Sequence, residues 1–328
     1  MRKGWVLAVC AVAFIGTGAR AQTVQVPNVY AIPLPPMLEP RFELGVRYWQ
    51  SVGKTHFSIN SSRQNPTYGN PTSVLKYEDM DGYSGEFFWY ARNETDTFAK
   101  GFVGGGGLSG DSLDDEDYYA GQIKFSDTFS KLKGDDLIYG TIDVGQHFAL
   151  IDRTTKFSLS PFIGFNFWQE TATAYGVRCN KDDIDGALCG TPGTVVVPFS
   201  TEVIENQANW SSLRLGGEVE LKLWNRLRVM GEAAVLPVAY VWNEDSHFLR
   251  QDLGRVPNVV DRGLGWGYQL EAALRYDFTP GWSAGAGVRY WYATVDGKSE
   301  FVHFDEEVEL KQFTSERFGV YGDISYRF

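Results

Sequence analysis

The C-terminal stretch from Phe318 to Phe328 constrains the fold of this chain more than any other segment. Every second side chain, counted from Phe318, is apolar, aromatic or glycine, and the side chains between them include Asp323 and Arg327. Because successive side chains of an extended backbone point to opposite faces, one face suits lipid and the other suits water. A last strand of this kind, ending on an aromatic residue, is typical of a membrane-spanning β-barrel. An amphipathic edge strand of a soluble sandwich is the alternative.

The N-terminus predicts export. Arg2 and Lys3 precede an apolar run over 5–15, and Ala-Arg-Ala at 19–21 ends the segment. This pattern predicts a secretory signal peptide over 1–21, removed in the mature protein. After it, no stretch approaches the roughly 18 continuous apolar residues of a membrane helix. If the mature chain crosses a membrane, we therefore expect it to do so as a closed barrel.

The mature chain divides into a short lead-in and one strand-rich domain. Residues 22–40 contain five prolines, which favour an extended periplasmic lead-in. Residues 41–328 form a single predicted domain with ten segments of strand character. These lie at roughly 42–58, 74–92, 97–108, 136–150, 156–172, 210–224, 227–242, 262–278, 282–296 and 312–328.

The connections between these segments alternate between short and long. The short ones are 93–96, 152–155, 225–226 and 279–281, and the long ones are roughly 59–73, 109–135, 173–209, 243–261 and 297–311. Short turns on one rim and long loops on the other are characteristic of up-and-down barrels in bacterial outer membranes. We therefore predict an all-β, transmembrane, antiparallel barrel of about ten strands, with long extracellular loops and short periplasmic turns. The expected location is the outer membrane of a Gram-negative bacterium.

Charge and cysteine usage narrow the function further. Removal of the leader leaves 27 basic against 41 acidic residues, a balance of −14, which repels phosphate and argues against nucleic acid as a partner. Cys10 leaves with the leader. Cys179 and Cys189 remain, and in an exported protein such a pair predicts a loop disulfide, with a free-thiol or metal pair as the alternatives.

Two polar clusters follow strands that end on the same rim. Asp115 and Asp117 lie just beyond the third segment, and Asp245 and His247 lie just beyond the seventh. Each pair is spaced i, i+2, so both members point the same way in extended chain. The third and seventh strands of a ten-stranded barrel stand on roughly opposite walls, and we expect the pairs to face each other across the mouth.

This arrangement suits the activation of water. An Asp beside a His orients the imidazole and raises its basicity, so that the imidazole takes a proton from water. A facing carboxylate pair that shares a proton holds that water or protonates a leaving group. Taken singly, each cluster has a simpler interpretation, because acidic loops are usually solvated patches or divalent-cation sites, and a lone loop His is usually an ordinary surface residue.

The sequence gives weaker support to other candidate sites. Residues 182–186 suggest calcium, but they lack the full ligand spacing, and an unliganded acidic loop is the better interpretation. His147 and Asp143 share one face of the fourth segment, which predicts a hydrogen-bonded pair in the lumen. We predict no metal site and no cofactor.

The sequence resembles the omptins, ten-stranded outer-membrane proteases whose active site lies in a groove at the extracellular rim. The stretch 113–119 is similar to the family segment with paired aspartates, which fall on Asp115 and Asp117. The stretch 243–248 is similar to the Asp-x-His segment, which falls on Asp245 and His247. Residues 53–55 and 169–170 also match. The resemblance implies an aspartic-type endopeptidase in which Asp245 and His247 activate the water that attacks a peptide bond.

The chain departs from the family pattern in two places. Members that cut beside basic residues carry acids near the positions of Phe57 and Asn243, and both residues are uncharged here. A preference for Arg or Lys at the cleavage point is therefore not expected, because a buried guanidinium would lack its counter-ion. The family also binds lipopolysaccharide through residues that match the region of Trp168 and Glu170, and Ala172 stands where a basic residue belongs.

Three functions compete on this sequence. The first is an omptin-like endopeptidase that uses Asp115, Asp117, Asp245 and His247 on surface peptides or proteins, with outer-membrane lipid or lipopolysaccharide as a partner. The second is a non-enzymatic barrel of the same fold, serving as an adhesin or envelope structural protein. The third is a small-solute pore, which ranks last because inward charges tend to pair across a narrow lumen and plug it.

Overall fold

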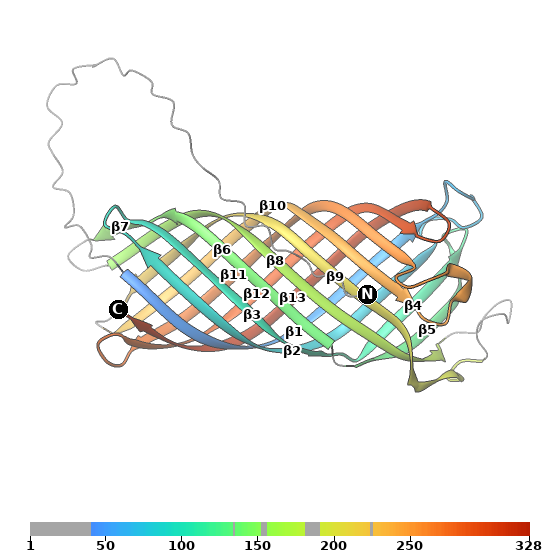
Figure 1. Ribbon diagram of the computed structural model, residues 1–328, viewed down its shortest axis with the longest axis horizontal. Coiled ribbons are helices and arrows are strands. Elements are labelled where there is room, and N and C mark those ends of the chain that lie inside the picture. Colours follow the sequence, from blue (N-terminus) through green and yellow to red (C-terminus); the bar gives the residue numbers. More distant parts are fainter. Residues whose placement is uncertain (1–40, 134, 152–155, 181–190, 224–225) are drawn as a thin grey trace, which may run out of the picture. The chain divides into compact units, whose positions relative to one another are not determined.

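The described part of the chain is one antiparallel β-barrel (Figure 1). The computed structural model describes residues 41–133, 135–151, 156–180, 191–223 and 226–328. The predicted leader and the Pro-rich lead-in lie outside the described residues, as do Cys189 and the acidic stretch 182–186. No helix among the described residues is long and apolar enough to cross a membrane.

Thirteen strands and one short 3₁₀ helix make up the described residues. The elements are β1 (Arg41–Asn60), β2 (Ser73–Arg92), β3 (Thr97–Ser109), β4 (Ser112–Tyr119), β5 (Ile123–Lys133), β6 (Asp135–Gln146), β7 (Phe148–Ile151), β8 (Lys156–Cys179), β9 (Val195–Lys222), β10 (Leu227–His247), η1 (Gln251–Leu253), β11 (Val259–Asp277), β12 (Trp282–Phe301) and β13 (Glu306–Arg327).

These strands run around the barrel as ten courses. β3 and β4 both pair with β2, so they form one interrupted course. β5, β6 and β7 all pair with β8 and form the next. β1 pairs with β13 from Glu43↔Arg327 to Asn60↔Glu309, which closes the barrel. The predicted up-and-down barrel of ten strands is thereby confirmed.

The alternation of side chains agrees with the prediction. On β13, Phe318, Val320 and Ile324 are exposed on the outer wall, whereas Tyr321 and Asp323 are buried inside. β11 follows the same rule, with Leu264, Trp266, Leu270, Leu274 and Tyr276 on the outside. Because these outward side chains are apolar on course after course, the barrel carries a lipid-facing band.

Three of the predicted long loops are shorter than expected. The stretch 109–135 consists mostly of the paired strands β4 and β5, which extend the barrel beyond its apolar band. Likewise, β9 begins at Val195, and β12 and β13 are joined by 302–305 alone. The long-loop end is therefore a tall β-wall, and residues assigned to loops by the sequence are held by hydrogen-bond ladders.

Ion pairs fill the lumen near the short-turn end. Arg289 donates to Glu86 at 2.7 Å and to Glu271 at 2.9 Å. Arg275 donates to Glu43 at 2.8 Å and to Asp323 at 2.7 Å. A second group joins Lys100, Asp143, Arg214, Glu218 and Glu232. Among the described residues the lumen is therefore occupied by paired charges, as the sequence predicted for a narrow barrel.

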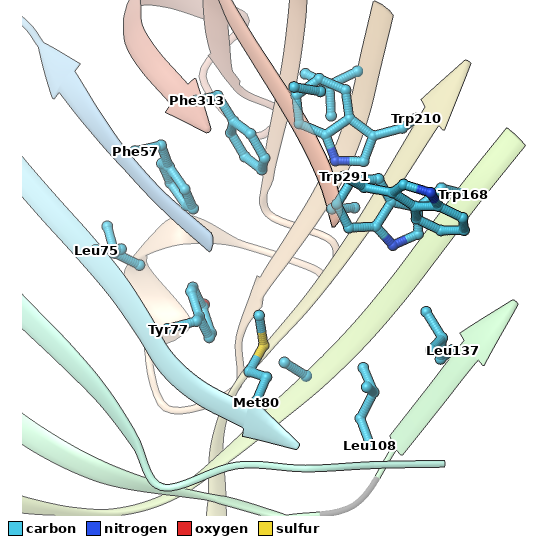
Figure 2. Close-up of a cluster of buried hydrophobic side chains, with 14 of the residues drawn as sticks. Phe57, Leu75, Tyr77, Met80, Leu108, Leu137, Trp168, Trp210, Trp291 and Phe313 are labelled. Atoms are coloured by element: carbon cyan, nitrogen blue, oxygen red, sulfur yellow. The ribbon is translucent and has the colours of Figure 1, made fainter. Parts of the chain in front are cut away.

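An aromatic layer lies above these ion pairs, closer to the long-loop end. Trp49 packs on Trp291 with ring centroids 4.9 Å apart, and Trp168 packs on both Trp291 and Trp210. Figure 2 shows three of these indoles gathered beside the strands that carry them. Each is buried, with at most 3% of its surface exposed. The layer separates the charged lumen from the mouth.

One buried ion pair crosses this layer. Arg317 is fully buried, and its Nε donates to Glu170 at 2.6 Å, while Nη1 donates to the Met80 carbonyl at 3.1 Å. A Cβ placed on Gly53 or Gly82 would come within 2.7 Å of the guanidinium. Both glycines therefore make room for Arg317.

We predict that Glu170→Ala destabilises the barrel. It would leave the Arg317 guanidinium buried without its carboxylate, which costs about 3–5 kcal/mol. Urea unfolding in detergent or vesicles, followed by tryptophan fluorescence, measures the change. Lys298→Ala removes the exposed Lys298–Glu307 pair instead and is expected to cost about 0–1 kcal/mol. Equal effects of the two substitutions would contradict this account.

Candidate active site at the long-loop end

The acidic pair Asp115 and Asp117 lies on a strand. Both residues belong to β4, where Asp115 pairs with Leu75 and Asp117 with Ser73 of β2. The i, i+2 spacing places the two carboxyls on the same face of β4. Glu116, between them, points to the other face and bonds Lys76 at 2.8 Å. The sequence thus predicted the shared face correctly, although it placed these residues in a loop.

The second pair lies at the C-terminal end of β10. Asp245 is 2% exposed, and its Oδ2 lies 3.1 Å from His247 Nε2. This contact is the Asp–His pair that the spacing predicted. Asp245 Oδ1 is buried and has no hydrogen-bond partner among the described residues.

The backbone of His247 is fixed by Asn258, a residue that the sequence did not indicate. The ladder between β10 and β11 ends at Asp245↔Val259, two residues before the histidine. Beyond it, the Asn258 side chain accepts from His247 N at 2.9 Å and donates to His247 O at 3.1 Å. The fully buried amide thus replaces a partner on β11 and fixes the backbone that carries the imidazole. No local motif marks this contact, which depends on the path of the loop over 248–258.

The two pairs influence each other across the mouth. Burial, followed by the charge of Asp117, raises the pKa of Asp115 to about 7, although the charge of His247 opposes the rise. Burial also raises the pKa of Asp117, against Ser73, Arg250 and His247. Both carboxyls therefore keep their protons to higher pH than an ordinary aspartate does. The expectation that the pair faces His247 is thus supported by electrostatics acting in both directions.

His247 is biased towards its charged form. Burial lowers its pKa, but the charge and hydrogen bond of Asp245, followed by the charge of Asp115, outweigh burial, so that the pKa lies above its ordinary value. Arg250, beyond the end of β10, acts in the opposite sense. An imidazole of raised basicity suits a general base.

Below the pairs, the floor of the mouth is aromatic. Phe57 stacks on Phe313 with ring centroids 4.7 Å apart and on Tyr77 with centroids 6.5 Å apart. Figure 2 shows the three side chains near one another. Phe57 is 1% exposed and Asn243 is fully buried. The two positions at which the family pattern carries acids thus lie in the floor of the mouth without charge.

A fourth carboxyl stands beside this floor. Asp261 on β11 pairs directly with Asn243, whose Nδ2 donates to Asp261 Oδ2 at 2.8 Å. The sequence treated Asp261 as the last residue of a long loop. The alternation of β11, continued two residues towards its start, would have placed it on the inner face with Gly263 and Gln269.

The structure places the region matched to the family's lipid-binding residues and corrects one other expectation. Trp168, Glu170 and Ala172 are all buried on the inner face of β8, so they do not face lipid. The predicted pair of His147 and Asp143 does not form. His147 Nδ1 lies 2.9 Å from the Ser160 hydroxyl, while Asp143 accepts from Arg214.

Of the two cysteines in the predicted disulfide, only Cys179 lies among the described residues. Cys179, at the end of β8, is buried and disulfide-bonded. Its predicted partner, Cys189, lies outside the described residues.

Comparison with known proteins supports the fold. No family model matches the chain, and no curated protein matches it. Among solved structures, the outer-membrane protease OmpT from Escherichia coli is similar with a TM-score of 0.66 and 12% identity, over 88% of this chain and 97% of that one. At this identity the likeness shows the fold alone. The resemblance to the omptins is therefore confirmed at the level of the barrel.

Two further barrels align less closely. The translocator domain of the autotransporter NalP from Neisseria meningitidis gives a TM-score of 0.32 at 10% identity, over 87% of this chain and 88% of that one. A FadL homologue from Pseudomonas aeruginosa gives 0.24 at 8% identity, over 88% and 90%.

We predict that Asp245→Asn lowers the pKa of His247. The substitution removes the charge that holds the proton on the imidazole, while burial and Arg250 continue to oppose that proton. NMR titration of the imidazole protons measures the change, with His247→Ala identifying the signal. Glu244→Gln is the control, because Glu244 bonds Trp242 instead. An unchanged pKa in Asp245→Asn would show that the pair has no electrostatic role.

Proposed function

We propose that this protein is an outer-membrane endopeptidase that cleaves peptides at the extracellular mouth of its barrel. The proposal is carried by one observation: His247, paired with Asp245 at 3.1 Å, shares a mutual electrostatic interaction with Asp115 on a course four places away around the barrel. A base and a proton-sharing carboxyl pair facing each other is the arrangement that water-mediated peptide hydrolysis needs. The fold shared with OmpT is consistent with it.

In the proposed mechanism, a water molecule lies between His247 and the pair Asp115 and Asp117. Neutral His247 takes a proton from this water, and Asp245 stabilises the imidazolium that forms. The water oxygen bonds to the peptide carbonyl carbon, and the carbon–nitrogen bond breaks as the leaving amine receives a proton. The shared proton of Asp115 and Asp117 stabilises the developing oxyanion or reaches the amine.

The uncharged floor of the mouth determines which substrate side chains we expect the site to accept. Phe57 and Asn243 offer no charge to a cationic side chain, and the stack of Phe57 on Phe313 fills the space between their strands. We therefore expect cleavage to follow determinants other than Arg or Lys at the cut bond. A peptide library with every residue class at each position identifies them.

Lipid is the proposed partner of the outer wall. Since Trp168, Glu170 and Ala172 face the interior, any contact with lipopolysaccharide must come from other residues. Assays with and without lipopolysaccharide, on protein folded in the same detergent, test whether it activates the enzyme. We propose that the mature protein, freed of its signal peptide, resides in the outer membrane of a Gram-negative bacterium.

We predict that His247→Ala lowers kcat/KM for peptide cleavage by about 10²–10⁴-fold, the usual contribution of a general base. Asp115→Asn is expected to give a loss of similar size. Folded protein incubated with the peptide library, followed by mass spectrometry, measures cleavage. Glu300→Gln, on the outer wall, is expected to keep wild-type activity. If wild type and His247→Ala leave the library equally intact, the protein is a non-enzymatic barrel.

We predict a bell-shaped dependence of kcat/KM on pH, with its maximum near neutrality. On the acidic limb, activity rises with pH as His247 loses its proton, and the raised pKa places this limb above the ordinary histidine value. On the alkaline limb, activity falls as the Asp115 carboxyl, whose pKa is about 7, loses the shared proton. A profile that rises from acid to alkaline pH without a decline would exclude a protonated carboxyl from the mechanism.

A further inference from the structure

We propose that Asn258 is a positioning residue of this site, whose side-chain amide takes the place of a missing strand partner and keeps the His247 imidazole on Asp245. The inference rests on the proposed peptidase function and names a residue that controls the rate of the same reaction. Asn258 lies in the loop between β10 and β11 and belongs neither to the acidic pair nor to the Asp–His pair.

The register of β10 against β11 leaves His247 without an ordinary partner. The ladder ends at Asp245 and Val259, so the same register, continued by two residues, would set His247 opposite Pro257. Proline has no backbone N–H and cannot donate to the His247 carbonyl. β10 therefore loses its β11 partner at the residue that carries the imidazole.

Both backbone polar groups of His247 face this gap. The next residue bonds to β9 on the other side, because Phe248 N donates to the Val203 carbonyl at 3.0 Å. Backbone groups of successive residues in a strand point to alternate sides, so the N–H and the carbonyl of His247 point towards β11. Without a replacement partner, both would be left without a ladder bond on that side.

The Asn258 side chain fills the gap with the bonding pattern of a peptide group. Its Oδ1 accepts from His247 N at 2.9 Å, and its Nδ2 donates to His247 O at 3.1 Å. A hydrogen-bonded antiparallel pair exchanges the same two bonds, one in each direction. The amide of Asn can do this because it carries a donor and an acceptor on separate atoms, which a hydroxyl or a carboxylate does not.

Asn258 is itself held in place. Its backbone N donates to Asp245 O at 3.2 Å, and its backbone O accepts from Val302 N at 3.0 Å, directly after the end of β12. It has no exposed surface, so a peptide in the mouth does not reach it. Any effect of Asn258 on a reaction must therefore pass through His247.

The support matters because the Asp–His contact lies at the end of a strand. Asp245 is fixed by ladder pairs with Val259 on one side and Asn206 on the other. His247 Nε2 lies 3.1 Å from Asp245 Oδ2, and this bond is kept only if the His247 backbone does not move away. A displacement of about 1 Å at a reacting group can cost about 10²-fold in rate.

The first test is Asn258→Ala, which removes both bonds to the His247 backbone. We expect kcat for cleavage of a peptide from the library, measured at the optimum pH of each protein, to fall by about 10–10²-fold. KM is expected to stay close to the wild-type value, because Asn258 does not touch the peptide. An unchanged kcat would overturn the inference.

A double variant separates positioning from stability. If Asn258 acts through the imidazole, Asn258→Ala should cause no further loss of kcat when it is added to His247→Ala. A residue that only stabilises the fold lowers the active fraction by the same factor in both backgrounds. Equal losses with and without His247 would therefore contradict the positioning role.

Hydrogen exchange tests the contact without any activity. Asn258 accepts from the His247 amide, and Asn258→Ala is expected to make this amide exchange about tenfold faster or more, as measured by NMR on the folded protein. The N–H is the better reporter, because the His247 carbonyl also accepts from Arg250 N at 3.3 Å.

Two further variants complete the test. Asn93→Ala is the matched control, because Asn93 Oδ1 accepts from Thr95 N and Thr97 N, both at 3.0 Å, in a short turn far from the site in the strand order. It is expected to leave kcat and the exchange of the His247 amide unchanged. Asn258→Asp keeps the size and the acceptor and loses the donor to His247 O. It is expected to lower kcat in the same direction and replaces Asn258→Ala if that variant does not fold.

The outcomes distinguish this inference from the proposed function. If the protein cleaves peptides and Asn258→Ala changes neither kcat nor the exchange of the His247 amide, the inference is wrong and the peptidase stands. If wild type leaves the library intact but the His247 amide loses protection in Asn258→Ala alone, the replacement of the strand partner stands and the peptidase proposal fails. An equal loss of kcat in Asn93→Ala would show general destabilisation and overturn the assignment to Asn258.

Discussion

The closure of the hydrogen-bond ladder between β1 and β13 is the constraint from which the rest of the structure follows. A sheet that spans lipid cannot leave an edge, because unpaired backbone groups have no partner in the hydrocarbon. Once the ladder closes, each residue of a spanning strand faces either lipid or lumen. The outer face is then fixed as apolar, and every charged residue of the spanning region must be accommodated inside.

The side chains of the inner face are arranged in layers along the barrel. Reading along β1 from its start, Glu43 and Arg47 join the ion pairs, Trp49 joins the aromatic layer, and Phe57 belongs to the floor of the mouth. Arginines in a narrow lumen lie close to carboxylates from several courses and neutralise them. The aromatic layer above then lies between the ion pairs and the mouth. Groups that need both water and burial are left with one location, the mouth.

Sequence alone predicted what alternation controls and missed what it does not. The alternation that produces the apolar band was enough to predict the ten courses, the two rims and the outward faces of β11 and β13. β4 and β5 were assigned to a loop because strands beyond the membrane need no apolar outer face, so their pattern lacks the usual period. The match at Trp168 and Glu170 is limited for another reason. A match between two segments does not tell which face of the strand each side chain takes, because a one-residue offset moves every side chain to the opposite face.

The residues around the site were hidden for a related reason. Asp115, Asp117, Asp245 and His247 are recognisable because each pair is local in sequence, at i, i+2. Asn258 and Asp261 act across strands or from a loop, so only the register of β10 against β11 reveals them. Their contacts depend on where the ladder stops, which local sequence does not encode.

The geometry of the site depends on the number of courses more than on any single residue. β4 and β10 are not neighbours, and no ladder joins them, so the distance between the two pairs is the distance across the barrel mouth. That distance grows with the number of strands and is otherwise fixed by their tilt and stagger. A barrel with more courses would carry the same four side chains too far apart to share one water molecule. Ten courses, with side chains reaching inward from opposite walls, hold Asp115 and His247 within electrostatic range.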